Sequence, residues 1–161
     1  MTGNFVFEEG LLGPAFSMYN GHISVAEQPM VAPLDTGQER VIKCAQPCNC
    51  HFSVTIDNAF WMMFCNAPDL CHFEVQMLFE GMGTHAEFDE PVAPIYVPYV
   101  AAPAPHVVTH NWAIPAYALP EGVYRVVATV KLVRWNGAVV LQKLPAVAFA
   151  DLGFMEVYDT P

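Results

Sequence analysis

The chain has 161 residues, of which 54% are hydrophobic and only 14% are charged, where about 25% is usual in soluble domains. Its 16 acidic and 6 basic residues give a formal charge of −10. The basic residues are scattered, which argues against nucleic-acid and anionic-membrane partners, and no apolar run approaches the ~18 residues of a membrane span.

The N-terminal part of the chain is long enough, and rich enough in proline and glycine, to wrap over a sheet. Its first ten residues include Glu8 and Glu9 and no Lys or Arg, unlike the basic start of a secretory signal. The sequence therefore predicts a cytoplasmic protein. We expect residues 1–35 to form an N-terminal extension that packs on a β-sandwich domain of residues 36–161.

Alternation of apolar and polar residues with a period of two is the dominant pattern, and it predicts strands with one buried face. The clearest examples are residues 51–57, 71–80 and 124–133. In the second and third of these, Leu78 and Val127 are apolar residues on the mainly polar face. Weaker strands are predicted at residues 16–26, 59–65, 95–100 and 106–114.

The C-terminal part of the chain predicts a hairpin. Trp135-Asn136-Gly137 closes the preceding strand, and Asn-Gly favours a tight turn. Residues 139–143 are expected to be the returning strand, which Pro145 interrupts because proline cannot donate to a ladder. We expect the last strand at residues 154–158, with a start as early as Ala146.

Residues 119–124 read Leu-Pro-Glu-Gly-Val-Tyr, so that a Pro and a Gly make a corner from which Tyr124 leads into a long β-prone run. This resembles the tyrosine corner of immunoglobulin-like sandwiches, in which the Tyr hydroxyl bonds back to the backbone. The antibody-type Cys two residues after the Tyr is absent, since Val126 stands there. With the strand pattern, the resemblance implies an all-β, two-layer immunoglobulin-like β-sandwich of about seven to nine antiparallel strands. A jelly roll or a small barrel is the alternative architecture.

So few ionised side chains predict that part of the surface is apolar and covered by a neighbour. The run Phe60-Trp61-Met62-Met63-Phe64 is apolar on both of its faces. We expect Trp61, Met63 and Phe64 to form an interface between the copies of a homo-oligomer. The alternative is that residues 1–35 of the same chain bury this run.

Four of the five cysteines form a candidate metal-ligand set: Cys48, Cys50, Cys65 and Cys71. Zn²⁺ sites are usually supplied by pairs of ligands with about two to four residues between them. Here the gaps are one and five residues, so zinc is the alternative and no cofactor is the leading expectation. In a reducing cytosol the cysteines are predicted to be buried free thiols.

No sequence pattern in the chain identifies a catalytic reaction. The Gly-x-Ser-x-Gly elbow and the glycine patterns of nucleotide-binding loops are absent. His106 and His110 would lie about 13 Å apart on a strand, too far apart for one metal ion, and are expected to face solvent. We therefore predict a non-enzymatic β-sandwich that acts through protein–protein association with copies of itself. The alternative is a domain that binds zinc or a small apolar ligand through its Cys and His residues, with an enzymatic activity left open.

Overall fold

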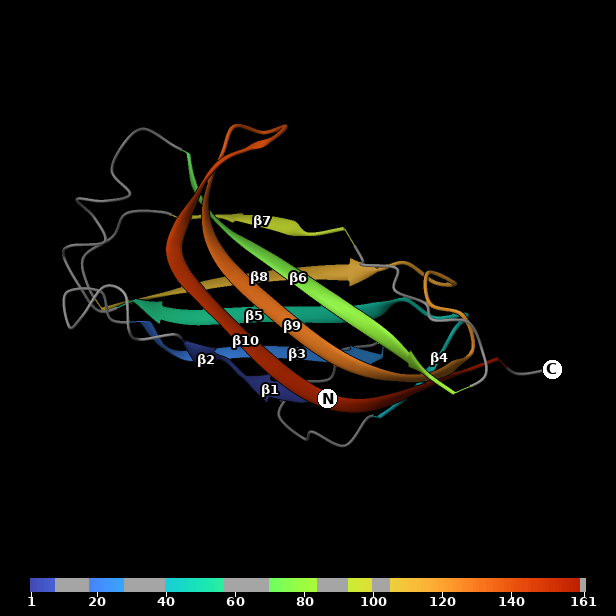
Figure 1. Cartoon of the computed structure of the whole chain (residues 1–161). Coiled ribbons are helices and arrows are strands. Elements are labelled where there is room, and N and C mark those ends of the chain that lie inside the picture. Colours follow the sequence, from blue (N-terminus) through green and yellow to red (C-terminus); the bar gives the residue numbers. More distant parts are fainter. Residues whose placement is uncertain (8–17, 28–39, 57–69, 84–92, 100–104, 160–161) are drawn as a thin grey trace.

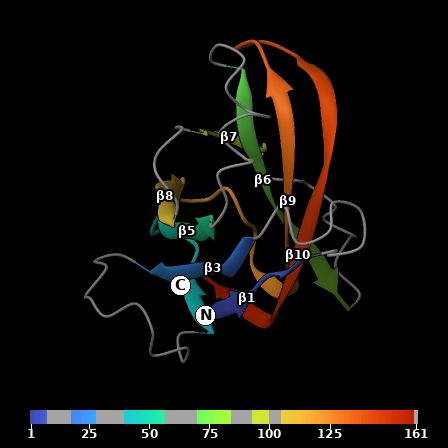
Figure 2. The same cartoon turned by 90° about the vertical axis from the view of Figure 1, so that its left-hand side faces the viewer.

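The computed structural model of the chain describes residues 1–7, 18–27, 40–56, 70–83, 93–99 and 105–159. These residues form ten strands and no helix. The strands make two sheets that lie face to face, as the two views in Figures 1 and 2 show. The predicted all-β, two-layer sandwich is therefore confirmed. Within these ranges there is no helix of the length and apolarity needed to cross a membrane.

The smaller sheet has four strands that are antiparallel throughout. In spatial order the strands are β1 (Thr2–Asn4), β3 (Met18–Glu27), β5 (Cys48–Ile56) and β8 (His106–Ile114). Burial along β5 alternates at every residue, with Phe52, Val54 and Ile56 on the inward face. This confirms the strand that period-two alternation predicts at residues 51–57.

The larger sheet has six strands and contains most of the C-terminal half of the chain. Its main path runs in the order β2 (Val6–Phe7), β10 (Val140–Tyr158), β9 (Gly122–Trp135), β6 (Cys71–Met82) and β7 (Ile95–Pro98). The sixth strand, β4 (Val41–Lys43), pairs with the end of β10 and is parallel to it. The strands predicted at residues 71–80 and 124–133 are β6 and β9, which pair along nearly their whole length.

The core lies between the two sheets and is built from the inward residues of both. Phe52 of β5 meets Phe73 of β6 across the gap, with ring centroids 5.9 Å apart. Met77 of β6 and Met155 of β10 are among the largest fully buried side chains. Burial of a side chain of this size contributes about 1.5–3 kcal/mol, so the inward residues of both sheets stabilise the stacked arrangement.

The tyrosine corner forms as the resemblance implies. The Tyr124 hydroxyl donates a hydrogen bond to the carbonyl oxygen of Pro120 over 2.8 Å. The ring is buried and packs edge-on against Phe79, with centroids 6.4 Å apart. Burial raises the pKa of the Tyr124 hydroxyl, which keeps the hydroxyl protonated as the donor. The corner thereby fixes the point at which β9 enters the sheet.

The C-terminal strand is longer than the sequence predicts. Residues 140–158 form one strand, β10, where a break at Pro145 and a separate last strand were expected. The expected break is replaced by a shift in register, because the four residue steps from Lys143 to Val147 lie opposite only two steps of β9, from Val133 to Lys131. A second shift follows at Gly153, whose φ is +85°. Such bulges bend a strand without ending it, and β9 and β10 curve together in Figure 1.

The N-terminal segment contributes strands to both sheets. We expected residues 1–35 to be an extension on the sandwich; the structure places β1 and β3 in the four-stranded sheet and β2 in the six-stranded sheet. β3 lies between β1 and β5, and Ile23 and Val25 on its inward face are fully buried. The weaker strands predicted at residues 16–26, 95–100 and 106–114 correspond to β3, β7 and β8, and residues 59–65 lie outside the described residues.

Candidate association surface

The predicted interface residues Trp61, Met63 and Phe64 lie outside the described residues, so their role stays a prediction. The structure instead brings together another apolar surface, on the outer side of the six-stranded sheet. We call this surface the outer face. It consists of the residues of β2, β4, β6, β9 and β10 that point away from the core, by the alternation of side chains along each strand.

Large hydrophobic side chains are concentrated on the outer face. Of the thirteen that are exposed among the described residues, eight lie on it, with between 38% and 61% of each side chain exposed. They are Val6, Val41, Leu78, Met82, Val123, Val147, Phe149 and Phe154. An antiparallel sheet that faces water normally alternates between apolar inward and polar outward residues, so this face departs from the usual pattern.

Strand register makes these side chains neighbours. Val6 of β2 pairs with Phe149 of β10, and Leu78 of β6 pairs with Val127 of β9. The sequence shows both Leu78 and Val127 as apolar residues at outward positions, and their pairing was not predictable from either strand alone. Phe149 was missed because it lies in the stretch where a break in the strand was expected.

The charges on the outer face balance. By the same alternation it carries four basic and four acidic residues, so its formal charge is zero, whereas the whole chain carries −10. The basic residues are Lys43, Arg125, Lys131 and Lys143, and the acidic residues are Glu74, Glu80, Asp151 and Glu156. The acidic excess of the chain therefore lies elsewhere.

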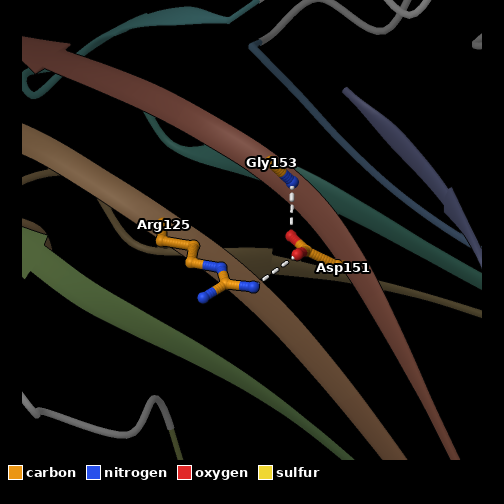
Figure 3. Close-up of polar contacts among 3 residues, drawn as sticks. All are labelled: Arg125, Asp151 and Gly153. Carbon is orange, nitrogen blue, oxygen red and sulfur yellow. Dashed lines mark hydrogen bonds and ion pairs between the residues drawn. The ribbon is translucent and has the colours of Figure 1, made fainter.

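One ion pair bridges β9 and β10 in the middle of the outer face. The guanidinium of Arg125 donates to a carboxylate oxygen of Asp151 over 2.7 Å, and the other oxygen accepts the backbone N–H of Gly153 at the bulge (Figure 3). The hydrogen bond from Arg125, followed by that from Gly153, lowers the pKa of Asp151. Both side chains are nearly half exposed, so the pair is open to water.

Aromatic and charged side chains cover the end of the outer face near β7, which we call the closed end. Tyr96 stacks on Trp135 with ring centroids 4.3 Å apart, and His72 meets Trp135 edge-on at 5.1 Å. Beside them the ammonium of Lys131 lies 3.3 Å from the carboxylate of Glu74. Burial, and then the neighbouring Glu74 carboxylate, raises the pKa of Tyr96.

At the closed end, an outward residue is fully buried by its neighbours on the same side of the sheet. Val133 of β9 points to the same side as Lys131, yet it is 0% exposed. The aromatic rings of the closed end shield that side of the sheet from water. By contrast, Phe149 and Phe154 are about half exposed, so the apolar part of the outer face is the part that the described residues leave in contact with solvent.

The outer side of the four-stranded sheet is mainly polar, with Tyr19 and Val107 as its exposed large apolar residues, and it carries no Lys, Arg, Asp or Glu at its described outward positions. Its polar residues are Thr2, Asn4, His22, Ser24, Asn49, His51, Ser53, Thr55, Thr109 and Asn111. A hydrogen bond of 2.6 Å joins Nδ1 of His51 to Oδ1 of Asn111 across β5 and β8. Except for Ser24, which is buried, these polar residues are at least partly exposed, so water can reach their hydrogen-bonding groups.

The candidate metal ligands are split between the two sheets. Cys48 and Cys50 lie on β5, Cys71 lies on β6, and all three are buried, while Cys65 lies outside the described residues. Burial, and to a lesser extent the neighbouring Cys48, raises the pKa of the Cys50 thiol, which disfavours the thiolate that zinc binds. The part of the chain that the structure describes brings together no group of three His, Cys, Asp or Glu side chains able to hold a metal ion.

The sequence predicts that His106 and His110 face solvent, but the structure places both on the inward side of β8. His110 pairs with Phe52 and His106 with Ile56, so both point toward the core side of the sheet and are half-buried. The His106 ring contacts Tyr99 at 5.8 Å between centroids. The expectation was wrong because the sequence of β8 gives no sign of which of its two faces is inward.

Comparisons with known proteins show no family for the chain. No family model and no curated protein matches the chain. Among solved structures, the chain is similar to the CARDB domain of a protein from Pyrococcus furiosus, solved in complex with di-metal ions. The two share 16% identity over 90% of each chain, with a TM-score of 0.38. A likeness of this degree assigns neither an activity nor a ligand to this chain.

Proposed function

We propose that this protein is a non-enzymatic β-sandwich that works by associating with further copies of itself, and that the outer face is a contact surface. The observation that carries the proposal is the outer face itself, on which eight exposed apolar side chains lie together on a surface of zero formal charge. Contiguous apolar patches of this kind mark interaction sites in soluble proteins.

Charge favours a second copy as the occupant. Two chains that each carry −10 repel one another over most of their surfaces. The outer face is a surface on which they can meet without a net repulsion, because its four basic residues match its four acidic residues. A two-fold contact is self-complementary, so the paired charges of one copy face the same set on the other.

The size of the outer face sets the expected strength of association. Four strands at about 4.8 Å spacing, and the eight residue steps from Val123 to Lys131 at about 3.3 Å, span roughly 500 Å². Two copies would then bury roughly 1,000 Å² in total, near the lower limit for a specific interface. We therefore expect reversible association in the micromolar range rather than a permanent assembly.

The test is sedimentation velocity on the double variant Phe149→Lys/Phe154→Lys. Both side chains are exposed, so the single chain tolerates the changes, whereas four added cations in a two-fold contact would repel. We expect the wild-type protein at tens of micromolar to have a weight-average mass above the 17.8 kDa of one chain, and the mass of the double variant to be lower. Circular dichroism and thermal unfolding confirm that the variant is folded.

A matched control separates contact from charge. Tyr117, in the turn before β9, and Val139, in the turn before β10, are at least as exposed as Phe149 and Phe154 and lie outside the strands of the outer face. Tyr117→Lys/Val139→Lys adds the same charge and removes exposed apolar side chains, and it should keep the wild-type mass. A wild-type protein that sediments as a single chain at these concentrations contradicts the proposal, and so does an equal loss of mass in both double variants.

A further inference from the structure

The edges of the two sheets are not protected alike. At the other sheet edges, β1, β2 and β4 are two or three residues long, and β7 is four residues long and ends in Pro98. β8 is nine residues long, from His106 to Ile114, and contains neither proline nor a Lys, Arg, Asp or Glu residue. Among the described residues no strand pairs with its second edge, and Figure 2 shows β8 at one end of the four-stranded sheet.

An edge of this kind favours the addition of another strand. Its unpaired backbone N–H and C=O groups form a template for pairing, and natural proteins usually blunt such edges with charges, prolines or short strands. On β8 the chain places prolines only outside the strand, at Pro105 and Pro115. Nine uninterrupted residues are longer than an average strand of about five to six, so β8 could hold a full partner strand.

The inward side chains of β8 also favour the addition of a strand at this edge. Val108 and Trp112 pack against the core, yet they remain only half-buried because no described strand continues the sheet beyond them. The His110 ring lies alongside that of Trp112, with centroids 6.3 Å apart. A strand added at this edge would extend the inner surface of the sheet and cover these side chains further.

We propose that β8 is a strand-addition site and that its occupant is β8 of a second copy, paired antiparallel about a two-fold axis. The joined sheet would then have eight strands. A second copy is favoured because the outward residues of β8, which are Val107, Thr109, Asn111 and Ala113, are all uncharged, as is the polar surface beside them. Two acidic chains can therefore meet at this edge without bringing acidic side chains of either strand together.

This contact is separate from the outer face, and it does not depend on it. β8 belongs to the four-stranded sheet, whereas the outer face belongs to the six-stranded sheet. A chain with two different two-fold contacts builds either a closed tetramer or an open filament. If both contacts form, the assembly of the wild-type protein grows beyond a dimer.

The experiment places like charges along the edge. In Thr109→Glu/Ala113→Glu, pairing about any two-fold axis near the middle of β8 brings carboxylates of the two copies within about 8 Å. The control is Ser53→Glu/Asn49→Glu on β5, because these residues are the register partners of Thr109 and Ala113 and lie one strand further in. There the added charges of the two copies lie three strand spacings apart, or about 14 Å, which exceeds the screening length of about 10 Å at 0.1 M salt.

The measurement is made in the Phe149→Lys/Phe154→Lys background, so that only the edge contact remains. We expect twice the 17.8 kDa of one chain for this background and for the β5 control, and the mass of a single chain for the edge variant. Mixing Thr109→Glu/Ala113→Glu with Thr109→Lys/Ala113→Lys should restore the dimer, because opposite charges then face each other across the pair.

The outcomes distinguish the two contacts. If the Phe149→Lys/Phe154→Lys background is already a single chain, the β8 proposal is overturned. This outcome includes the case in which β8 binds a strand of another protein. The outer face remains supported if the wild-type protein is larger than a single chain. A wild-type dimer that survives Phe149→Lys/Phe154→Lys and is lost on Thr109→Glu/Ala113→Glu supports β8 alone. Failure of the Glu and Lys variants to pair when mixed also overturns the β8 proposal.

Discussion

The outer sides of the two sheets differ although both cover the same core. The four-stranded sheet presents Ser, Thr, Asn and His to solvent and no Lys, Arg, Asp or Glu at its described outward positions. The six-stranded sheet presents half-exposed Phe and Val side chains among four charges of each sign. The core requires only that inward residues be apolar, so it explains neither surface. The contact that we propose for the outer face would account for the difference.

The comparison separates two kinds of apolar residue on one strand. On β10, Met155 is 0% exposed and faces the core, while its neighbour Phe154 is 50% exposed and faces out. Met155 stabilises the single chain through burial. Phe154 has little to contribute until something covers it. The two roles should therefore separate when each residue is replaced.

The largest expected effect is on the inward side. Met155→Ala should lower the free energy of unfolding by about 2–5 kcal/mol, because it removes a fully buried side chain and leaves a cavity. Phe154→Ala should change it by only about 0.5 kcal/mol, as exposed substitutions do. Urea unfolding at submicromolar concentration, where the chain is a single copy, measures both. Equal losses would break the distinction between the two sides of the sheet.

A smaller effect is expected from pH, and it should come from the six-stranded sheet. Asp151 has a lowered pKa in the folded chain, mainly because of Arg125. The stability that this pair contributes is therefore present above the unfolded-state value of about 3.9, and it is lost as the pH falls through the folded value. Because both side chains are open to water, the contribution is small.

Replacement of either partner tests this pH dependence. Asp151→Asn should flatten the fall of the melting temperature in the acid range, since an amide does not titrate. Arg125→Gln should have the same effect, because without the guanidinium the carboxyl titrates more nearly as in the unfolded chain. Calorimetry between about pH 2 and pH 6 covers the window given by the unfolded value. An unchanged slope in both variants would show that Asp151 makes no such contribution.

Local sequence patterns predict much of the fold. Alternation within residues 51–57, 71–80 and 124–133 predicts β5, β6 and β9, and the Pro-Glu-Gly-Val-Tyr segment predicts the hydrogen bond from Tyr124 to Pro120. Each of these signals lies within a dozen residues or so, and each needs no knowledge of a partner strand. They are sufficient to predict a β-sandwich.

The candidate surface could not be predicted in the same way, because it depends on register between distant strands. Leu78 and Val127 are visible in the sequence as apolar residues at outward positions, but only the pairing of β6 with β9 makes them neighbours. Phe149 depends further on β10 continuing past Pro145. Pro145 taken alone suggests a break in the strand. The shift in register that replaces the break arises from the pairing of β10 with β9.

The central claim is that another copy covers the outer face, and hydroxyl-radical footprinting over a range of protein concentrations tests it most directly. We predict that labelling of Phe149, Phe154 and Met82 falls as the concentration rises through the micromolar range. Tyr117 is 69% exposed, lies outside the outer face and should be labelled equally throughout. Constant labelling of Phe149 and Phe154 at all concentrations would contradict the account.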